Sequence, residues 1–71
     1  MLSHEQYDAL ERAIIDGKRV AIQRRGRREY VLIPLRLRMI GGREAIDAQN
    51  PTTGDDLLIY LDEIDAIEAV R

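Results

Sequence analysis

Residues 28–40 decide the fold; they read REYVLIPLRLRMI and are followed by Gly41 and Gly42. Apolar residues recur at every second position and predict a long β-strand with one apolar face, while Arg36 and Arg38 point to the other side. Pro34 has no N–H to donate to a central ladder, so we expect a bend or bulge there. A long bent strand is typical of a small β-barrel, which has to turn a corner. The predicted apolar face consists of Val31, Ile33, Leu35, Leu37 and Met39, and Tyr30, Leu32 and Pro34 make the first half of the strand apolar on both faces.

Downstream of this strand, Gly41 and Gly42 fit a two-residue hairpin loop that needs positive φ. The returning strand is expected at residues 43–49, with Ala45 or Ile46 and Ala48 competing for the core. Turn-forming residues at 50–55 predict a loop, and the apolar run LLIYL at 57–61 predicts a short strand buried on both sides. A tight turn and a last strand at 65–70 follow in our interpretation. A helix over 62–70 stays open as an alternative, because the apolar residues there also fit helical spacing.

Upstream, the sequence KRVAIQR at 18–24 alternates and predicts a half-buried strand with Val20 and Ile22 on its apolar face, followed by a turn at 25–27. The segment before it predicts a helix over about 4–16. Ser3 can cap this helix, Gln6 completes a capping box, and Gly17 supplies the left-handed residue that ends it. Tyr7, Leu10, Ala13 and Ile14 form one apolar stripe that must lie against the sheet.

These elements predict a mainly β domain: an N-terminal α-helix followed by a five-stranded antiparallel barrel of the Sm-like or SH3 type. With 71 residues the chain has room for one small domain, with the helix at about 4–16 and the barrel at about 18–70. It contains no cysteine and so no disulfide or cysteine-based metal site. The apolar stretches at 30–35 and 57–61 are more than one helix can cover, and we therefore expect a homo-oligomer, a dimer or higher.

The sequence shows no membrane or targeting signal. Its longest apolar run, at 30–35, is far shorter than a bilayer span, and the first residues include acids such as Glu5 and Asp8. We expect a cytoplasmic protein without a membrane partner.

Charge is strongly segregated along the chain, although the net charge is only −2. Residues 18–43 hold nine Lys and Arg residues against one acid, Glu29, whereas residues 44–71 hold eight acids against Arg71. A basic central third therefore lies between two acidic segments.

The arginines of the basic third are the candidate ligand-binding residues. Guanidinium groups bind phosphates bidentately and stack on bases, which suits a nucleotide or a single-stranded nucleic acid. In the competing interpretation the same arginines form a solvated face or pair with Asp47, Asp55, Asp56, Asp62 and Glu63. Tyr30 is the only aromatic residue in this third. The candidates are Arg24, Arg25, Arg27, Arg28, Arg36, Arg38 and Arg43.

Catalytic, metal and cofactor sites are not predicted. His4 is the only histidine, its neighbour Ser3 is interpreted as a helix cap and not as a nucleophile, and the glycines lack the spacing of a phosphate loop. The acidic residues after position 54 lack calcium-loop spacing and fit a solvated face, or a surface for a basic protein partner. We therefore expect a binding protein and not an enzyme.

The order of motifs resembles the WYL domain of bacterial transcription regulators. The resemblance rests on LERAIIDGKRVAIQ from Leu10, VLIPLRL from Val31, Ala48, and LDEI from Leu61. The Trp-Tyr-Leu triplet that names the family would fall at residues 44–46, which are Glu, Ala and Ile here. The resemblance implies an Sm-like barrel in a non-enzymatic regulatory module that senses a ligand such as a nucleic acid or nucleotide.

A more distant likeness is to the Rho-binding antiterminator Rof, through YDALE from Tyr7 and LDEI from Leu61. This likeness also implies a helix and an Sm-like barrel, but with a protein partner. The alternative function is therefore a protein–protein adaptor that docks through its acidic C-terminal third.

Overall fold

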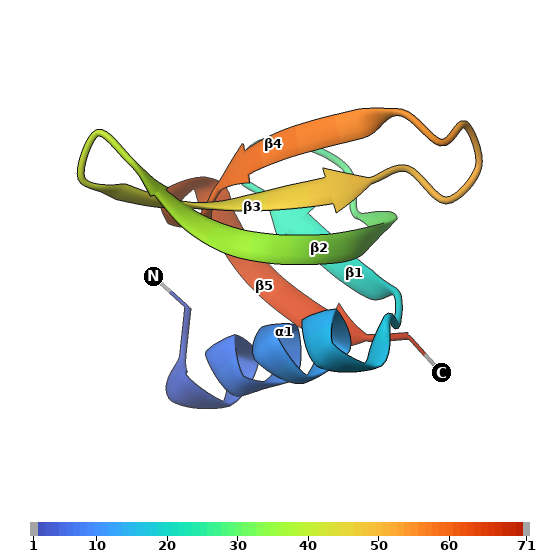
Figure 1. Cartoon of the computed structure of the whole chain (residues 1–71). Coiled ribbons are helices and arrows are strands. Elements are labelled where there is room, and N and C mark those ends of the chain that lie inside the picture. Colours follow the sequence, from blue (N-terminus) through green and yellow to red (C-terminus); the bar gives the residue numbers. More distant parts are fainter. Residues whose placement is uncertain (1, 71) are drawn as a thin grey trace.

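The computed structural model describes residues 2–70, which form one helix and a single five-stranded antiparallel sheet (Figure 1). The strand order is β4-β3-β2-β1-β5, so β4 and β5 are the two edges. The predicted fold class is confirmed, but the sheet is strongly curved and does not close, because β4 and β5 do not pair with each other. The elements are α1 (His4–Asp16), β1 (Val20–Arg24), β2 (Tyr30–Ile40), β3 (Arg43–Gln49), β4 (Asp56–Tyr60), the 3₁₀ turn η1 (Leu61–Glu63) and β5 (Ile64–Ala69).

Helix α1 begins and ends where its capping residues predict. The Ser3 hydroxyl accepts a hydrogen bond from the Gln6 N–H at 3.1 Å, and the Gln6 side chain accepts one from the Ser3 N–H at 2.9 Å. Gly17 has φ of 67° and ends the helix in the left-handed conformation. The predicted apolar stripe packs onto the sheet, with Leu10 and Ala13 buried, and α1 covers the side formed by β2 and β5 (Figure 1).

Strand β2 contains the predicted bulge next to Pro34. Pro34 pairs with Ala48 and Arg36 with Asp47, so Leu35 is an extra residue without a partner on β3. Of the two apolar faces predicted for the first half of the strand, the one with Leu32 and Pro34 is buried, whereas Leu35 on the other is 47% exposed. The extra residue shifts the alternation, so beyond the bulge Leu37 packs partly against the core. The strand also starts at Tyr30, two residues later than predicted.

The β2–β3 hairpin follows its glycines. Gly41 and Gly42 have φ of 55° and 80°, as a two-residue turn requires. Strand β3 occupies the predicted residues. Of the two alternatives for the core, Ala45 and Ile46, both are buried, but on opposite faces. Ile46 and Ala48 face the core, while Ala45 is buried on the opposite face between Arg38 and Tyr60.

The last third of the chain is strand and not helix. Strand β4 pairs with β3, η1 makes a tight turn, and β5 pairs with β1, so the helix alternative over 62–70 is wrong. Strand β4 is not buried on both sides as predicted, because only its inner face packs against the core. Its Ile59 is buried, but Leu58 on the outer face is 42% exposed.

The core lies inside the curved sheet and is aliphatic. No polar or charged residue among residues 2–70 is buried. No helix in this part of the chain is long and apolar enough to span a membrane. The buried core cluster consists of Leu10, Ala13, Val20, Ile22, Leu32, Ile46, Ala48, Ile59, Leu61, Ile64 and Ile67.

Candidate anion-binding site

The seven candidate arginines fall into two groups that the fold keeps apart. Three of them, Arg36, Arg38 and Arg43, belong to β2 and β3. The other four, Arg24, Arg25, Arg27 and Arg28, surround the turn between β1 and β2.

The two arginines of β2 are paired with one carboxylate. Arg36 lies directly opposite Asp47 in the β2–β3 register, and its Nε is 2.6 Å from Asp47 Oδ2. Arg38 Nε is 3.1 Å from the same oxygen. The hydrogen bond from Arg36 and the positive charge of Arg38 lower the pKa of Asp47 against the effect of desolvation. This cluster matches the competing interpretation, in which arginines and acids neutralise each other.

Arg43 is engaged in the same way. Its Nε and Nη2 donate to the two carboxylate oxygens of Asp62 at 2.9 and 2.8 Å, a bidentate pair. Its guanidinium carbon also lies 3.7 Å from the centre of the Tyr60 ring. The hydrogen bonds between Arg43 and Asp62 raise the pKa of the arginine and lower that of the carboxyl group.

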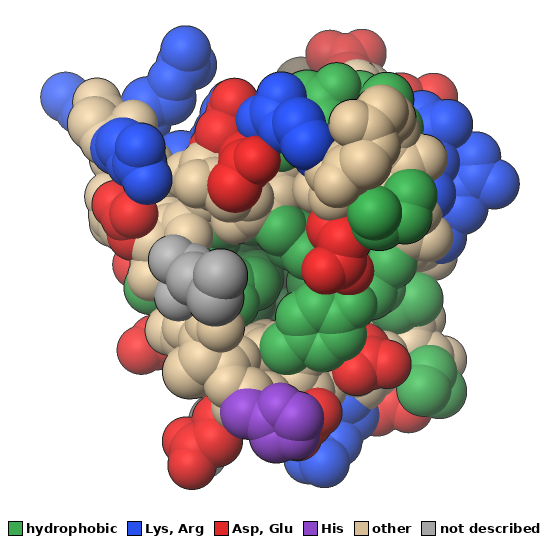
Figure 2. All heavy atoms as spheres, turned by 90° about the vertical axis from the view of Figure 1, so that its left-hand side faces the viewer, with side chains coloured by type: hydrophobic (Ala, Val, Ile, Leu, Met, Phe, Trp, Pro, Cys, Tyr) green, Lys and Arg blue, Asp and Glu red, His purple; other side chains and the backbone are tan. Residues whose placement is uncertain are grey.

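The face around the β2–β3 turn shows the result of this pairing (Figure 2). Acidic and basic side chains are interleaved there around a hydrophobic centre. A hollow at this end of the molecule is lined by Leu2, Met39 and Leu61 together with charged residues that include Arg43, Glu44 and Asp62. The Glu44 carboxylate accepts a hydrogen bond from the Tyr7 hydroxyl at 2.6 Å, so both acids already have partners.

The arginines of the β1–β2 turn differ from those of β2 and β3, because most of them are not ion-paired within residues 2–70. The Arg27 N–H donates to the Arg24 carbonyl at 3.1 Å across Gly26, whose φ is 68°, and the Gln23 side-chain amide donates to the Arg27 carbonyl at 2.7 Å. Arg25, Arg27 and Arg28 are exposed, and within residues 2–70 none of them forms an ion pair. These three arginines of the turn therefore stay exposed without an ion-pair partner in the described part of the chain.

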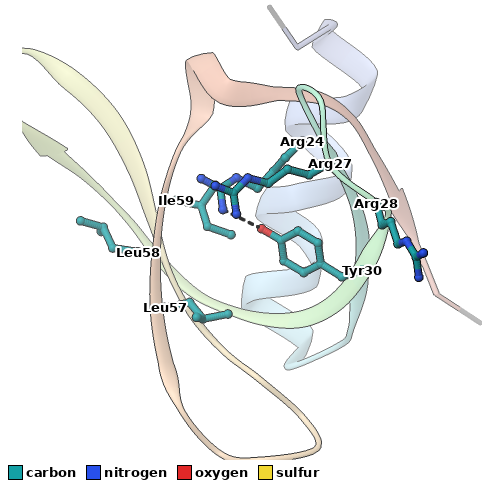
Figure 3. A pocket seen from close by; sticks show the side chains of 7 residues that line it. All are labelled: Arg24, Arg27, Arg28, Tyr30, Leu57, Leu58 and Ile59. Atoms are coloured by element: carbon teal, nitrogen blue, oxygen red, sulfur yellow. Dashed lines mark hydrogen bonds between the residues drawn. The ribbon is translucent and has the colours of Figure 1, made fainter.

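Arg24, Arg27 and Arg28 border a hollow of about 460 Å³ where the sheet fails to close (Figure 3). Tyr30 and Ile22 are paired, and Leu57 and Ile59 pair with core residues of β3, so these side chains belong to the inner face of the sheet. The hollow is thus the open end of the barrel interior, with β4 on one side and the β1–β2 turn on the other. It is lined by Arg24, Arg27, Arg28, Tyr30, Leu57, Leu58 and Ile59.

Within residues 2–70, Arg24 is the one arginine of the turn that has a carboxylate partner. Its Nη2 lies 2.7 Å from Glu63 Oε1, and its Nη1 donates to the Tyr30 hydroxyl at 3.5 Å. The hydrogen bonds to Glu63 and Tyr30 raise the pKa of Arg24. Both the arginine and the tyrosine therefore have a fixed orientation at the rim of the hollow (Figure 3).

The arginines that line this hollow were named as candidates from the sequence, and Glu63 as one of their possible partners, but the apolar wall was not predicted. Leu57 and Ile59 are far from the turn in sequence and reach it only because β4 is an edge strand. The run of apolar residues at 57–61 was a signal for a strand, not for a ligand site. Among residues 2–70, no group of three metal-ligating side chains is placed to hold a metal ion.

Comparison of the chain with protein-family models and with curated proteins finds no match.

Proposed function

We propose that the chain is a non-enzymatic binding module that holds an anionic ligand, a nucleotide or a single-stranded nucleic acid, in the hollow between the β1–β2 turn and β4. The observation that carries this proposal is the contrast between the two groups of arginines. Those of β2 and β3 are paired with acids, whereas Arg27 and Arg28 line a hollow and have no ion-pair partner among residues 2–70.

The residues of the hollow suit the two parts of a nucleotide. Guanidinium groups bind phosphate oxygens with paired N–H donors. The Tyr30 ring and the side chains of Leu57 and Ile59 supply apolar surface for a base, and stacking of a base on an aromatic ring contributes about 1–3 kcal/mol. The volume of about 460 Å³ is within the usual size of a small-molecule site.

The resemblance to WYL domains supports a regulatory role for such binding, since that family is thought to sense nucleic acids or nucleotides. The N-terminal helix and the curved antiparallel sheet fit the fold that this resemblance implies. In this proposal the chain acts in transcription regulation by reporting the presence of its ligand to another protein.

Fluorescence anisotropy with a short labelled oligothymidylate at low salt tests the proposal. The double variant Arg27→Ala with Arg28→Ala should lose most of the binding. Arg36→Ala with Arg38→Ala is the matched control, because it removes the same charge from arginines that are paired with Asp47 on β3, and it should bind nearly as the wild type does. Absence of wild-type binding at low salt, or equal loss in both double variants, would overturn the proposal.

The adaptor function is the second candidate, and the free edge of β5 favours it. Asp65 and Glu68 on this strand are exposed and form no ion pair within residues 2–70. A basic protein segment could contact them along the unpaired edge. A pull-down after nuclease treatment distinguishes the candidates: an adaptor retains one protein, and loses it in Asp65→Asn with Glu68→Gln, whereas the nucleic-acid binder retains none.

Self-association also remains a proposal. Val31, Leu35 and Leu58 are exposed on the outer face of the sheet, where a second copy would cover them. Analytical ultracentrifugation at micromolar protein should then show a dimer or a larger species, and a monomer throughout would contradict this part of the proposal.

A further inference from the structure

Glu63 occupies a position that suits an anion. A second, smaller hollow of about 220 Å³ adjoins the first at Arg24 and is lined by Arg24, Arg25, Arg27 and Glu63. Three arginines thus line the same hollow as one carboxylate, and Arg24 contacts that carboxylate at 2.7 Å. Arg24 lines both hollows, so one side chain connects the place where Glu63 lies to the proposed ligand site.

In the Arg24–Glu63 ion pair, the carboxylate can leave more easily than the guanidinium group. The Glu63 side chain is 40% exposed and that of Arg24 is 24% exposed, so the carboxylate can turn toward solvent more readily than the arginine can. Tyr30 also holds the guanidinium from its other side, through the hydrogen bond to Nη1. Loss of Glu63 would therefore leave Arg24 oriented at the rim of the hollow.

The backbone keeps Glu63 in reach whether or not its side chain is bound. The Arg25 N–H donates to the Glu63 carbonyl at 3.0 Å, and this bond joins η1 to the β1–β2 turn independently of the carboxylate. The local concentration of the carboxylate at Arg24 is therefore permanently high, as for any tethered binding group.

We propose that Glu63 is an intramolecular competitor of the ligand, which holds Arg24 in the free protein and is displaced from it when a ligand phosphate binds. The inference rests on the proposed function, because it concerns the same hollow and the same arginines. Glu63 then sets the affinity of the site for its ligand, because the Arg24–Glu63 ion pair must be broken before Arg24 can bind the phosphate. The free energy of that ion pair is subtracted from the free energy of the contact between Arg24 and the ligand.

Removal of the carboxylate should then tighten ligand binding. Glu63→Gln is expected to lower the Kd for the labelled oligothymidylate by about two- to fivefold, the size of effect typical of partly exposed ion pairs. Asp62→Asn is the matched control, since it removes the same charge from the same 3₁₀ turn but from a residue that pairs with Arg43 and lines neither hollow. It should change the Kd by much less.

A double-mutant cycle separates competition from general repulsion between carboxylate and ligand. If Glu63 competes for Arg24, Glu63→Gln has no effect on the Kd when Arg24 is already replaced by Gln. If Glu63 simply repels the phosphate, the Glu63→Gln substitution tightens binding both in the wild type and in the Arg24→Gln variant, and the proposal is wrong. Glu63→Asp provides a second variant, because it keeps the charge but shortens the reach toward Arg24, and it should also tighten binding. Thermal melts establish that every variant is folded.

The outcomes also distinguish this inference from the function on which it rests. If neither the wild type nor Glu63→Gln binds the oligonucleotide at low salt, the proposed function fails and the competitor fails with it. If the wild type binds and Arg27→Ala with Arg28→Ala does not, but Glu63→Gln binds no more tightly than the wild type, the function stands and the competitor is overturned.

Discussion

The bulge at Leu35 makes a sharp prediction about the stability of β2. In a regular strand Leu32 and Leu37, five residues apart, would lie on opposite faces, whereas in the structure both pack toward the core across the bulge; Leu32 is 0% exposed and Leu35 is 47% exposed. Truncation of a buried leucine to alanine costs about 2–5 kcal/mol through lost burial and the cavity left behind. Truncation of a half-exposed one that fills no cavity costs about 0.5 kcal/mol or less.

The difference is large for a chain of this size. At about 0.05–0.15 kcal/mol per residue, a domain of 71 residues has a free energy of unfolding of about 4–11 kcal/mol. Leu32→Ala should therefore remove a large part of the stability, and Leu35→Ala very little. Urea denaturation followed by far-UV circular dichroism measures both. A larger loss for Leu35→Ala than for Leu32→Ala would refute the inward face assigned to the first half of β2.

Other predictions concern the surface and the turns. Tyr7→Phe should cost about 1 kcal/mol by removing the hydrogen bond to Glu44. That bond raises the pKa of Tyr7 from 10.0 to about 12, so the difference in stability between wild type and Tyr7→Phe should be full below pH 10.0 and disappear as the pH rises toward 12 in thermal melts. The pKa shift of Asp47 has the opposite sign: the pKa is lowered, chiefly by the hydrogen bond from Arg36. Asp47→Asn should therefore destabilise the protein at neutral pH, and this difference from the wild type should vanish in thermal melts as the pH falls through the folded-state pKa of Asp47. Gly42→Ala should destabilise the protein by about 1–2 kcal/mol in urea through backbone strain alone, since φ is 80° and no atom lies within 4 Å of the added methyl group; an unchanged midpoint would count against the positive-φ turn.

The parts of the fold that local chemistry determines were predictable from the sequence. Ser3, Gln6 and Gly17 mark both ends of α1 because each acts on backbone groups within a few residues. Gly41 and Gly42 likewise determine their own turn. The inward face of β2 was not predictable, because alternation alone does not say on which side of the proline the extra residue lies.

In the candidate site, too, the features that depend on neighbouring residues were predictable, and those that depend on distant residues were not. The arginines of the β1–β2 turn are neighbours in sequence and were recognised as a basic cluster. The pairing of Arg24 with Glu63 joins residues 39 positions apart, and the wall formed by Leu57 and Ile59 exists only because the sheet stays open at β4. Whether an arginine is free or neutralised therefore depends on strand register, which composition and charge counts do not contain.

A ¹H–¹⁵N NMR titration of the wild-type protein with unlabelled oligothymidylate is the most direct test that the open end of the curved sheet receives the ligand. The account predicts shift changes concentrated in the β1–β2 turn and at residues 57–59, with the amides of Arg36 and Asp47 nearly unmoved. Shifts that centre instead on the outer face of β2 and β3, or spectra that do not change at low salt, would contradict it.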